Sequence, residues 1–134
     1  MSLVVGDWNG DGRDDLVTAN FRSNDVSALV GNGDGTFRIE RRFAVGSTPN
    51  SLVAGDFNGD GIPDLAAANF GGDDLSVLFG NGDGSFQADR RFVVGGKPTS
   101  VAASDINGDG HADLVISDFD DDDTSVLLRN KDAY

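Results

Sequence analysis

The stretch that decides the fold is SLVAGDFNGDGIPDLAAAN, which runs from Ser51 to Asn69. Two short apolar segments enclose an acidic loop that is rich in Gly, Asn and Asp. Apolar segments of this length, bounded by such clusters, are typical of strands joined by a tight connection, and they leave no room for a helix. The stretch therefore predicts two neighbouring strands with an acidic loop between them.

This stretch belongs to a repeat, because a shift of 49 residues superposes the chain on itself without a gap. The repeat units are residues 2–50, 51–99 and 100–134. The first two units are identical at 29 of 49 positions, which excludes chance similarity. The third unit stops after 35 residues and is therefore incomplete.

Each complete unit contains four apolar segments. In the second unit we expect strands at Ser51–Ala54, Leu65–Ala68, Leu75–Phe79 and Phe86–Val94. The link Gly80–Gly84 has residues that tolerate positive φ, as a hairpin requires. Four strands in about 40 to 50 residues are the size of one β-propeller blade.

The expected fold is therefore all-β. It is a single propeller-type domain, 1–134, of three tandem four-stranded antiparallel blades. We expect the third blade to lack its fourth strand, because the sequence ends soon after the apolar segment Val126–Leu128.

The composition limits the partners of the chain. Twenty-two Asp and one Glu outweigh ten Lys and Arg, and the formal net charge is −13. Such a charge repels nucleic acid and anionic membranes, so neither is an expected partner. No apolar run approaches the roughly 18 residues of a membrane-spanning helix, so we expect no membrane insertion. Met1 leads directly into the repeat without a signal peptide, as in a fragment, which leaves the location of a parent protein open.

The acidic loop of each unit has the pattern Asp-x-Asn-Gly-Asp-Gly-x-x-Asp, at residues 7–15, 56–64 and 105–113. Oxygen donors at positions 1, 3, 5 and 9, with the backbone carbonyl of position 7, can enclose one hard cation. Cysteine is absent and histidine occurs once, which argues against zinc and copper, and Mg²⁺ favours a sparser site with several waters. The pattern therefore predicts three Ca²⁺ sites, one per blade.

The expected ligands are side chains and backbone carbonyls. The side-chain ligands are Asp7, Asn9, Asp11 and Asp15 in the first loop, Asp56, Asn58, Asp60 and Asp64 in the second, and Asp105, Asn107, Asp109 and Asp113 in the third. The carbonyl ligands belong to Arg13, Ile62 and His111.

Two other interpretations of the loop are less favoured. An EF-hand begins with the same pattern but requires a bidentate Glu at position 12, where this chain has Thr18, Ala67 and Ile116. The flanking segments also have strand composition, whereas an EF-hand needs helices. A turn without metal would place nine carboxylates in three identical frames with nothing to offset their repulsion.

Three other features have simpler explanations. His111, the sole histidine, is expected to face solvent instead of acting in catalysis. Trp8, Phe57 and Ile106 share one repeat position, which indicates packing more than stacking on a sugar. The acidic run 118–123 aligns with the turns between second and third strands, and we expect a solvated turn, with extra cation binding as the alternative.

Residues 51–69 and the segment LFGNGDGSF at 78–86 resemble the VCBS and FG-GAP class of calcium-binding blades, related to the propeller of integrin α subunits. The resemblance covers essentially the whole chain. Integrin-type repeats have Gly-Ala-Pro after the loop, whereas Ala19–Phe21 and Ala68–Phe70 stand there in this chain, so the match is to bacterial VCBS-type repeats. The resemblance implies a ring of about six to eight blades, with calcium loops on one face and second-to-third strand turns on the other.

Three blades cannot close such a ring. The expected partners are therefore further blades of a longer chain, or other copies that self-associate into a closed ring. The expected function is a non-catalytic structural, adhesion or protein-interaction scaffold, because no nucleophile and base pair is visible. The alternative is a carbohydrate-binding module, since some fungal lectins resemble these calcium blades. Extracellular modules bind Ca²⁺ at about 10⁻⁴–10⁻³ M, so we expect the parent protein to be secreted or on the cell surface.

Overall fold

The apolar segments form eleven strands in the computed structural model, which describes residues 1–129. The first sheet contains β1 (Leu3–Gly6), β2 (Asp15–Asn20), β3 (Asp25–Leu29) and β4 (Arg41–Ala44). The second contains β5 (Pro49–Gly55), β6 (Asp64–Asn69), β7 (Asp74–Leu78) and β8 (Arg90–Val93). The third contains β9 (Pro98–Ser104), β10 (Asp113–Asp118) and β11 (Asp123–Leu127). Among these described residues, no helix is long and apolar enough to cross a membrane.

All three sheets are antiparallel and connect their strands in chain order. Their registers agree with the repeat: Val5 lies opposite Leu16, and Ala54 lies opposite Leu65 in the second sheet. The expectation of propeller-type blades is therefore confirmed, as is a third sheet of three strands within residues 1–129. Residues 130–134, which belong to the expected third blade, lie outside the described residues.

The first strand of the second blade is longer than the expected Ser51–Ala54. Strand β5 begins at Pro49, which lies opposite Asn69, while Ser51 lies opposite the next residue, Ala68. Asn50 is thus an extra residue in a bulge. Proline is tolerated at the first residue of a strand and at bulges, so Pro49 extends the strand without breaking the ladder.

The fourth strand is shorter than the expected Phe86–Val94. Phe86 pairs with Gly80 only through an isolated bridge, and the N–H of Gln87 donates to the carbonyl of Phe79 (2.8 Å). These bonds join the two ends of the loop to each other, so the chain pairs with β7 only from the start of β8. The first half of the expected strand is therefore part of the connection.

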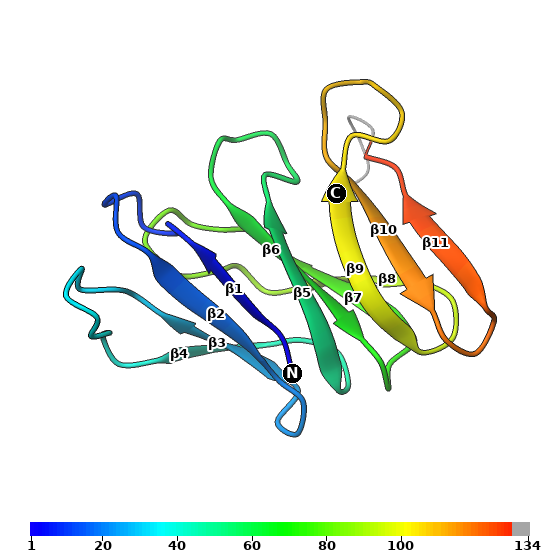
Figure 1. Ribbon diagram of the computed structural model, residues 1–134, viewed down its shortest axis with the longest axis horizontal. Coiled ribbons are helices and arrows are strands. Elements are labelled where there is room, and N and C mark those ends of the chain that lie inside the picture. Colours follow the sequence, from blue (N-terminus) through cyan, green and yellow to red (C-terminus); the bar gives the residue numbers. More distant parts are fainter. Residues whose placement is uncertain (130–134) are drawn as a thin grey trace.

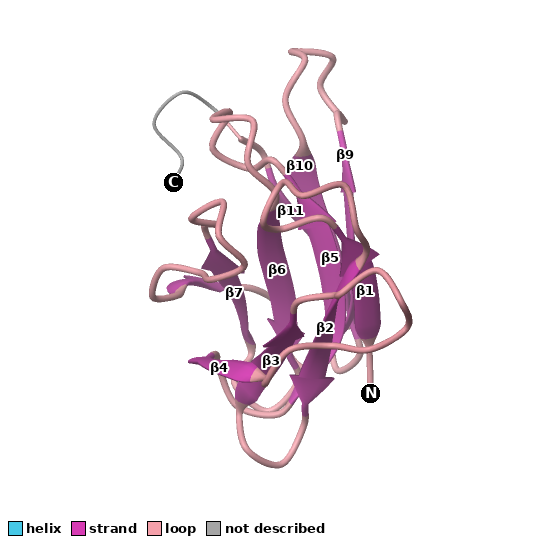
Figure 2. Cartoon of the chain, turned by 90° about the vertical axis from the view of Figure 1, so that its left-hand side faces the viewer, coloured by secondary structure: helices cyan, strands magenta, loops and turns pink. Residues whose placement is uncertain are grey.

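The sheets are arranged as a fan. Figure 1 shows β1, β5 and β9 side by side in the middle, with β4 and β11 at its outer edges. The loops between first and second strands lie at one end of the fan, and the turns between second and third strands lie at the other. Figure 2 shows the same sheets from the side of the first blade, stacked one behind another.

The core lies between the sheets. The first cluster, between the first and second sheets, consists of Trp8, Val17, Ala19, Val26, Ala28, Val45, Leu52, Leu65, Ala67, Leu78 and Phe86. The second, between the second and third sheets, consists of Phe57, Ala66, Ala68, Leu75, Val77, Phe79, Val101, Leu114 and Ile116. Strand β6 contributes to both clusters and is buried throughout, and its Ala residues let the two neighbouring sheets pack closely.

Each sheet has two different faces. We call the face that contains Leu52 or its repeat counterparts the front face, and the opposite face, with Phe57 or its counterparts, the back face. The back face of one blade packs against the front face of the next. At the two ends of the fan these faces are open: Leu3 on the first front face is 54% exposed, against 6% for Leu52. Ile106 on the last back face is 54% exposed, against 0% for Phe57.

Substitution at the repeat position shared by Phe57 and Ile106 tests the packing between blades. We expect Phe57→Ala to lower the free energy of unfolding by about 3–5 kcal/mol, because it leaves a cavity between two sheets. Ile106→Ala is the matched control on the open face, and its cost is expected to be less than about 1 kcal/mol. Urea denaturation of both variants measures the difference, and equal losses would contradict the packing.

Candidate metal centre

The first candidate loop, residues 7–15, is folded around the carboxylate of Asp7. Asp7 Oδ1 accepts hydrogen bonds from the N–H groups of Gly10 (2.8 Å) and Asp11 (3.1 Å), and Oδ2 accepts one from Gly12 (2.8 Å). Gly10 and Gly12 have φ of 72° and 79°, in the left-handed region that glycine tolerates. The Gly-Asp-Gly sequence therefore lets three successive N–H groups converge on one carboxylate.

Asn9 and Asp11 lie across the same loop. Asn9 Nδ2 donates to Asp11 Oδ2 (3.1 Å), and the N–H of Arg13 donates to Asp11 Oδ1 (2.9 Å). The bond from Arg13 holds the pKa of Asp11 below its ordinary value, although desolvation opposes it. This exposed loop therefore carries a negative charge at neutral pH.

The second and third candidate loops, 56–64 and 105–113, have the same hydrogen bonds. The carboxylates of Asp56 and Asp105 accept N–H bonds of 2.6–3.2 Å and 2.7–3.1 Å from their own loops. The amide at position 3 donates to the carboxylate at position 5 over 3.1 Å in both, through the pairs Asn58–Asp60 and Asn107–Asp109. The N–H groups of Ile62 and His111 donate to the same position-5 carboxylates.

Position 9 lies at the base of the loop instead of at its surface. Asp64 Oδ2 accepts hydrogen bonds from the N–H groups of Phe57 (2.7 Å) and Asn58 (3.3 Å), at the start of the candidate loop. Asp64 Oδ1 accepts a hydrogen bond from the N–H of Gly80 (2.9 Å), at the start of the link 80–84. We call this link and its counterpart 31–35 the glycine loops. Asp64 therefore clamps two loops of one blade together.

The counterparts of Asp64 make the same clamp. Asp15, Asp64 and Asp113 are 2%, 0% and 0% exposed. The remaining clamp bonds run from the N–H groups of Trp8 (2.9 Å) and Gly31 (2.8 Å) to Asp15, and from those of Ile106 (2.9 Å) and Arg129 (2.7 Å) to Asp113. The repeated Asp at position 9 thus has a structural role that the spacing of the motif does not show.

The environment of this carboxylate differs between the blades. Burial raises the pKa of Asp64, and the N–H groups of Gly80 and Phe57 oppose this only in part. Burial also acts to raise the pKa of Asp113, but there the N–H groups of Arg129 and Ile106 outweigh it, and the pKa is lowered. The second and third loops therefore hold this carboxylate in different electrostatic environments.

Each loop brings its first three candidate side chains together and keeps the fourth at its base. The carboxylates face backbone N–H groups. Across residues 1–129, no three Asp, Glu, His or Cys side chains gather in a cluster that could hold an ion as they stand. The ligand set therefore remains a prediction, and the backbone of each loop is folded without it.

Arg129 lies beside the loops and was not indicated by the motif. Its Nη1 lies 2.7 Å from His111 Nδ1, and because a guanidinium only donates, the imidazole accepts. A Cβ atom on Gly59, in the second loop, would lie 2.6 Å from Arg129 Nη2. His111 is partly buried, so its side chain faces solvent only in part, and Arg129 occupies its Nδ1. The repeat could have indicated a different role for Arg129, because it stands at the position that Gly31 and Gly80 occupy in the first two units.

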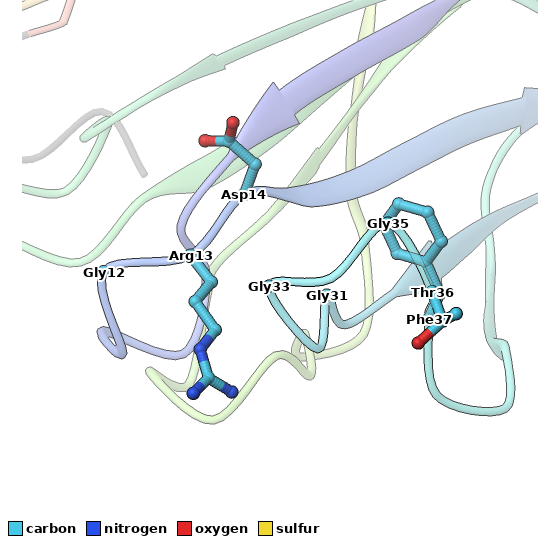
Figure 3. Close-up of a pocket in the computed structure, with 8 residues that line it drawn as sticks. All are labelled: Gly12, Arg13, Asp14, Gly31, Gly33, Gly35, Thr36 and Phe37. Carbon is cyan, nitrogen blue, oxygen red and sulfur yellow. The ribbon is translucent and has the colours of Figure 1, made fainter.

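A hollow of about 390 Å³ separates the first candidate loop from the first glycine loop (Figure 3). Its lining includes Arg13 and Asp14 from one loop and Gly33, Thr36 and Phe37 from the other. Figure 3 shows the Arg13 side chain extending between the two loops. The clamp at position 9 is what brings these two loops together.

Comparison with known families agrees with this repeat. The model of the FG-GAP-like repeat matches residues 7–67 and again residues 56–116. Because the two matches together span most of the sequence, this chain belongs to the FG-GAP-like repeat family. The resemblance seen in residues 51–69 is thereby confirmed. No curated protein matches the chain.

Two solved structures have a similar fold. BBS1N, crystallised in complex with ARL6DN, is 16% identical with a TM-score of 0.60, and the match covers 96% of this chain and 39% of BBS1N. The V. cholerae biofilm matrix protein Bap1 is 17% identical with a TM-score of 0.54, over 90% of this chain and 20% of Bap1. At these identities the likeness concerns the fold alone. The chain spans less than half the length of either structure.

The clamp can be tested separately from metal binding. In EDTA, we expect Asp64→Ala to lower the free energy of unfolding by about 2–5 kcal/mol, because buried N–H groups of Phe57 and Gly80 lose their acceptor. Asp60→Ala, at an exposed position of the same loop, is expected to cost less than about 1 kcal/mol. Chemical denaturation measures both, and a small loss for Asp64→Ala would show that the clamp contributes little.

Proposed function

We propose that this chain is a calcium-binding module of propeller blades that acts as a non-catalytic scaffold. The observation that carries the proposal is one loop geometry, with oxygen donors only, repeated in all three blades. The ions would be held by the side chains at positions 1, 3, 5 and 9 and by the carbonyls of Arg13, Ile62 and His111. Family membership supports this, because FG-GAP repeats commonly bind Ca²⁺.

The donor chemistry of these loops suits a hard cation, because all the expected ligands are oxygens. The two oxygens of a carboxylate offer about four lone-pair positions, and Asp7 uses three of them for backbone N–H groups. Asp15 uses two, so both side chains keep capacity for a cation. Residues 10–13 are exposed, so an ion can reach the loop from solvent.

Bound Ca²⁺ would act on the stability of the blades. Each loop holds three carboxylates among its expected ligands, and their mutual repulsion would be removed when an ion binds among them. Three ions would change the formal charge from −13 to about −7. The ion would also join the candidate loop to the position-9 clamp, and thereby to the glycine loop. Affinities of about 10⁻⁴–10⁻³ M would fill such sites outside cells, which supports a secreted or surface location.

The described residues favour a scaffold over an enzyme. His111 Nδ1 already accepts a bond from Arg129, and the repeated carboxylates accept backbone N–H bonds in every loop. These groups therefore have structural partners, and FG-GAP repeats are generally non-catalytic.

The first blade has an open position for the link from a preceding blade. The N–H groups of Phe70 and Phe119 donate to the carbonyls of Thr48 (3.0 Å) and Lys97 (3.1 Å) in the links that enter their blades. Phe21 is their counterpart, and within residues 1–129 its N–H makes no such bond. It lines a hollow of about 580 Å³. This position, with the open front face, supports the proposal that further blades or further copies continue the fan.

Calcium titration tests the metal proposal. We expect three Ca²⁺ ions per chain by isothermal titration calorimetry. At a free concentration 100 times the dissociation constant, each site would add about 2.7 kcal/mol to the free energy of unfolding. A melt unchanged between millimolar Ca²⁺ and EDTA would contradict the proposal.

Two matched variants locate the ions. We expect the triple variant Asp11→Ala, Asp60→Ala and Asp109→Ala to lose Ca²⁺ binding, because each loop loses one exposed carboxylate. The control is Asp34→Ala with Asp83→Ala, which removes carboxylates from the glycine loops and is expected to retain three ions. If the control variant loses Ca²⁺ binding and the triple variant retains it, the ions are assigned to the glycine loops.

Sedimentation velocity tests continuation of the fan by other copies. We expect the chain to associate, and Leu3→Glu on the front face or Leu128→Glu on the back face each to prevent it. Because the two variants damage opposite faces, an equimolar mixture is expected to form a heterodimer. A wild-type chain that stays monomeric at every concentration, or a mixture that fails to associate, would contradict copy-to-copy docking.

Carbohydrate binding is the second candidate function. The hollow beside the first candidate loop favours it, because its lining combines the polar residues Arg13, Asp14 and Thr36 with the aromatic Phe37. A glycan array in millimolar Ca²⁺ distinguishes the candidates: specific binding that Arg13→Ala abolishes would support a lectin.

A further inference from the structure

Trp8 connects the first candidate loop to two blades at once. It lies between the expected ligands Asp7 and Asn9, and its N–H donates to Asp15 Oδ2 (2.9 Å), the clamp of its own blade. Its carbonyl accepts a hydrogen bond from the N–H of Gly84 (3.1 Å), in the glycine loop of the second blade. The backbone between two expected ligands of the first blade is therefore held by the next blade.

The second glycine loop is a closed unit that is bonded to its own candidate loop. The N–H of Asn81 donates to the carbonyl of Ser85 (3.0 Å), and the side-chain amide of Asn81 donates to the hydroxyl of Ser85 (2.9 Å). At the start of this loop, the N–H of Gly80 donates to Asp64 Oδ1, the expected position-9 ligand of the second candidate loop. A continuous chain of bonds therefore runs from Asp64 to Gly84 and on to the first candidate loop.

Close packing holds the second glycine loop against the first blade. A Cβ atom on Gly84 would lie 2.7 Å from Cγ2 of Val30, which is 7% exposed. Two residues later, the ring of Phe86 packs edge-on against Trp8 (ring centroids 6.2 Å apart) and Phe43 (5.4 Å). Because the interface is tightly packed, a shift of the second glycine loop is passed to the first candidate loop.

We propose that the second candidate loop helps the first to hold Ca²⁺, so that the two sites bind cooperatively. This inference rests on the proposed calcium sites. An ion held by Asp64 would order the clamp and the glycine loop bonded to it, and the bond from Gly84 would then keep the first loop folded before its own ion arrives. A second ion that binds to an already ordered structure loses less conformational entropy, which gives positive cooperativity without a change of fold. By linkage, the first site strengthens the second by the same factor.

The single tryptophan of the chain makes the first site separately observable. Tb³⁺ is a hard cation that takes oxygen ligands as Ca²⁺ does, and its luminescence is excited by energy transfer from a nearby indole ring. Trp8 stands inside the first candidate loop, whereas Phe57 and Ile106 stand at the same position of the other two. Terbium emission excited through Trp8 therefore reports the occupancy of the first loop.

Removing the second site tests the coupling. In a terbium titration of the full chain, we expect Asp60→Ala to raise the midpoint of the first loop about threefold, the square root of a coupling factor of about ten between two equal sites. Charge alone predicts the opposite sign, because an emptied second loop is more negative than an ion-filled one and would tighten binding in the first. Asp109→Ala empties the third loop with the same loss of charge and is expected to have the smaller effect.

A matched pair of glycine variants tests the connection itself. Gly84→Ala places a Cβ atom against Val30 and is expected to separate the glycine loop from Trp8. In that chain, Asp60→Ala should no longer change the midpoint of the first loop. Gly35→Ala is the control: Gly35 is the counterpart of Gly84, its φ is 89° against 86°, and within residues 1–129 no atom lies within 4 Å of its Cβ position. The control shares the backbone strain without the clash, and it is expected to keep the threefold shift.

Three outcomes overturn the coupling. They are a midpoint that Asp60→Ala leaves unchanged or lowers, equal shifts for Asp60→Ala and Asp109→Ala, and a shift that persists in the Gly84→Ala chain. The first two comparisons need no glycine variant, so they decide the matter even if Gly84→Ala fails to fold. Failure of the calcium proposal has a different signature, because the wild-type chain then gives no saturable emission through Trp8. Saturable emission without coupling keeps the calcium sites and rejects only this inference.

Discussion

Every sheet in this chain has two apolar faces, and a sheet of four short strands cannot cover either of them with its own side chains. Burial therefore requires a neighbouring sheet. Leu65 and Ala67 of β6 face the first blade while Ala66 and Ala68 face the third, and all four are fully buried. The core of this protein is thus a property of adjacent blades, as in other repeat folds where each unit contacts only its neighbours. The links between blades and the open ends follow from this constraint.

The candidate loops have two functions that the motif alone does not separate. Asp7 and its counterparts fold the loop around themselves, and Asp64 and its counterparts fix that loop to the rest of the blade. Only the exposed groups, such as Asp11, are free of a buried structural role. The backbone of each loop is therefore organised without an ion, which would reduce the ordering that the proposed Ca²⁺ binding requires.

Much of this architecture can be predicted from residues 51–69, because Gly, Asn and Asp at fixed spacing determine where strands end and loops turn. Trp8 and Phe57 were correctly expected to pack, since a shared apolar position in a repeat indicates a shared interface. Tertiary contacts decided the rest. The bulge at Asn50 and the late start of β8 depend on partners in other strands, and the inward position of Asp64 depends on the N–H of Gly80. The contact between Arg129 and His111 arises where the third unit departs from the repeat.

The front and back faces of a blade are different surfaces, so the fan has a direction. A contact between unlike faces is heterologous, and it closes into a ring only if the rotation from one blade to the next divides a full turn evenly. If that rotation does not close, the same contact continues without limit and gives a helical filament. If further blades or copies dock on these faces as proposed, the angle between neighbouring blades, at the interface that contains β6 and Phe57, would decide between a closed ring and a fibre.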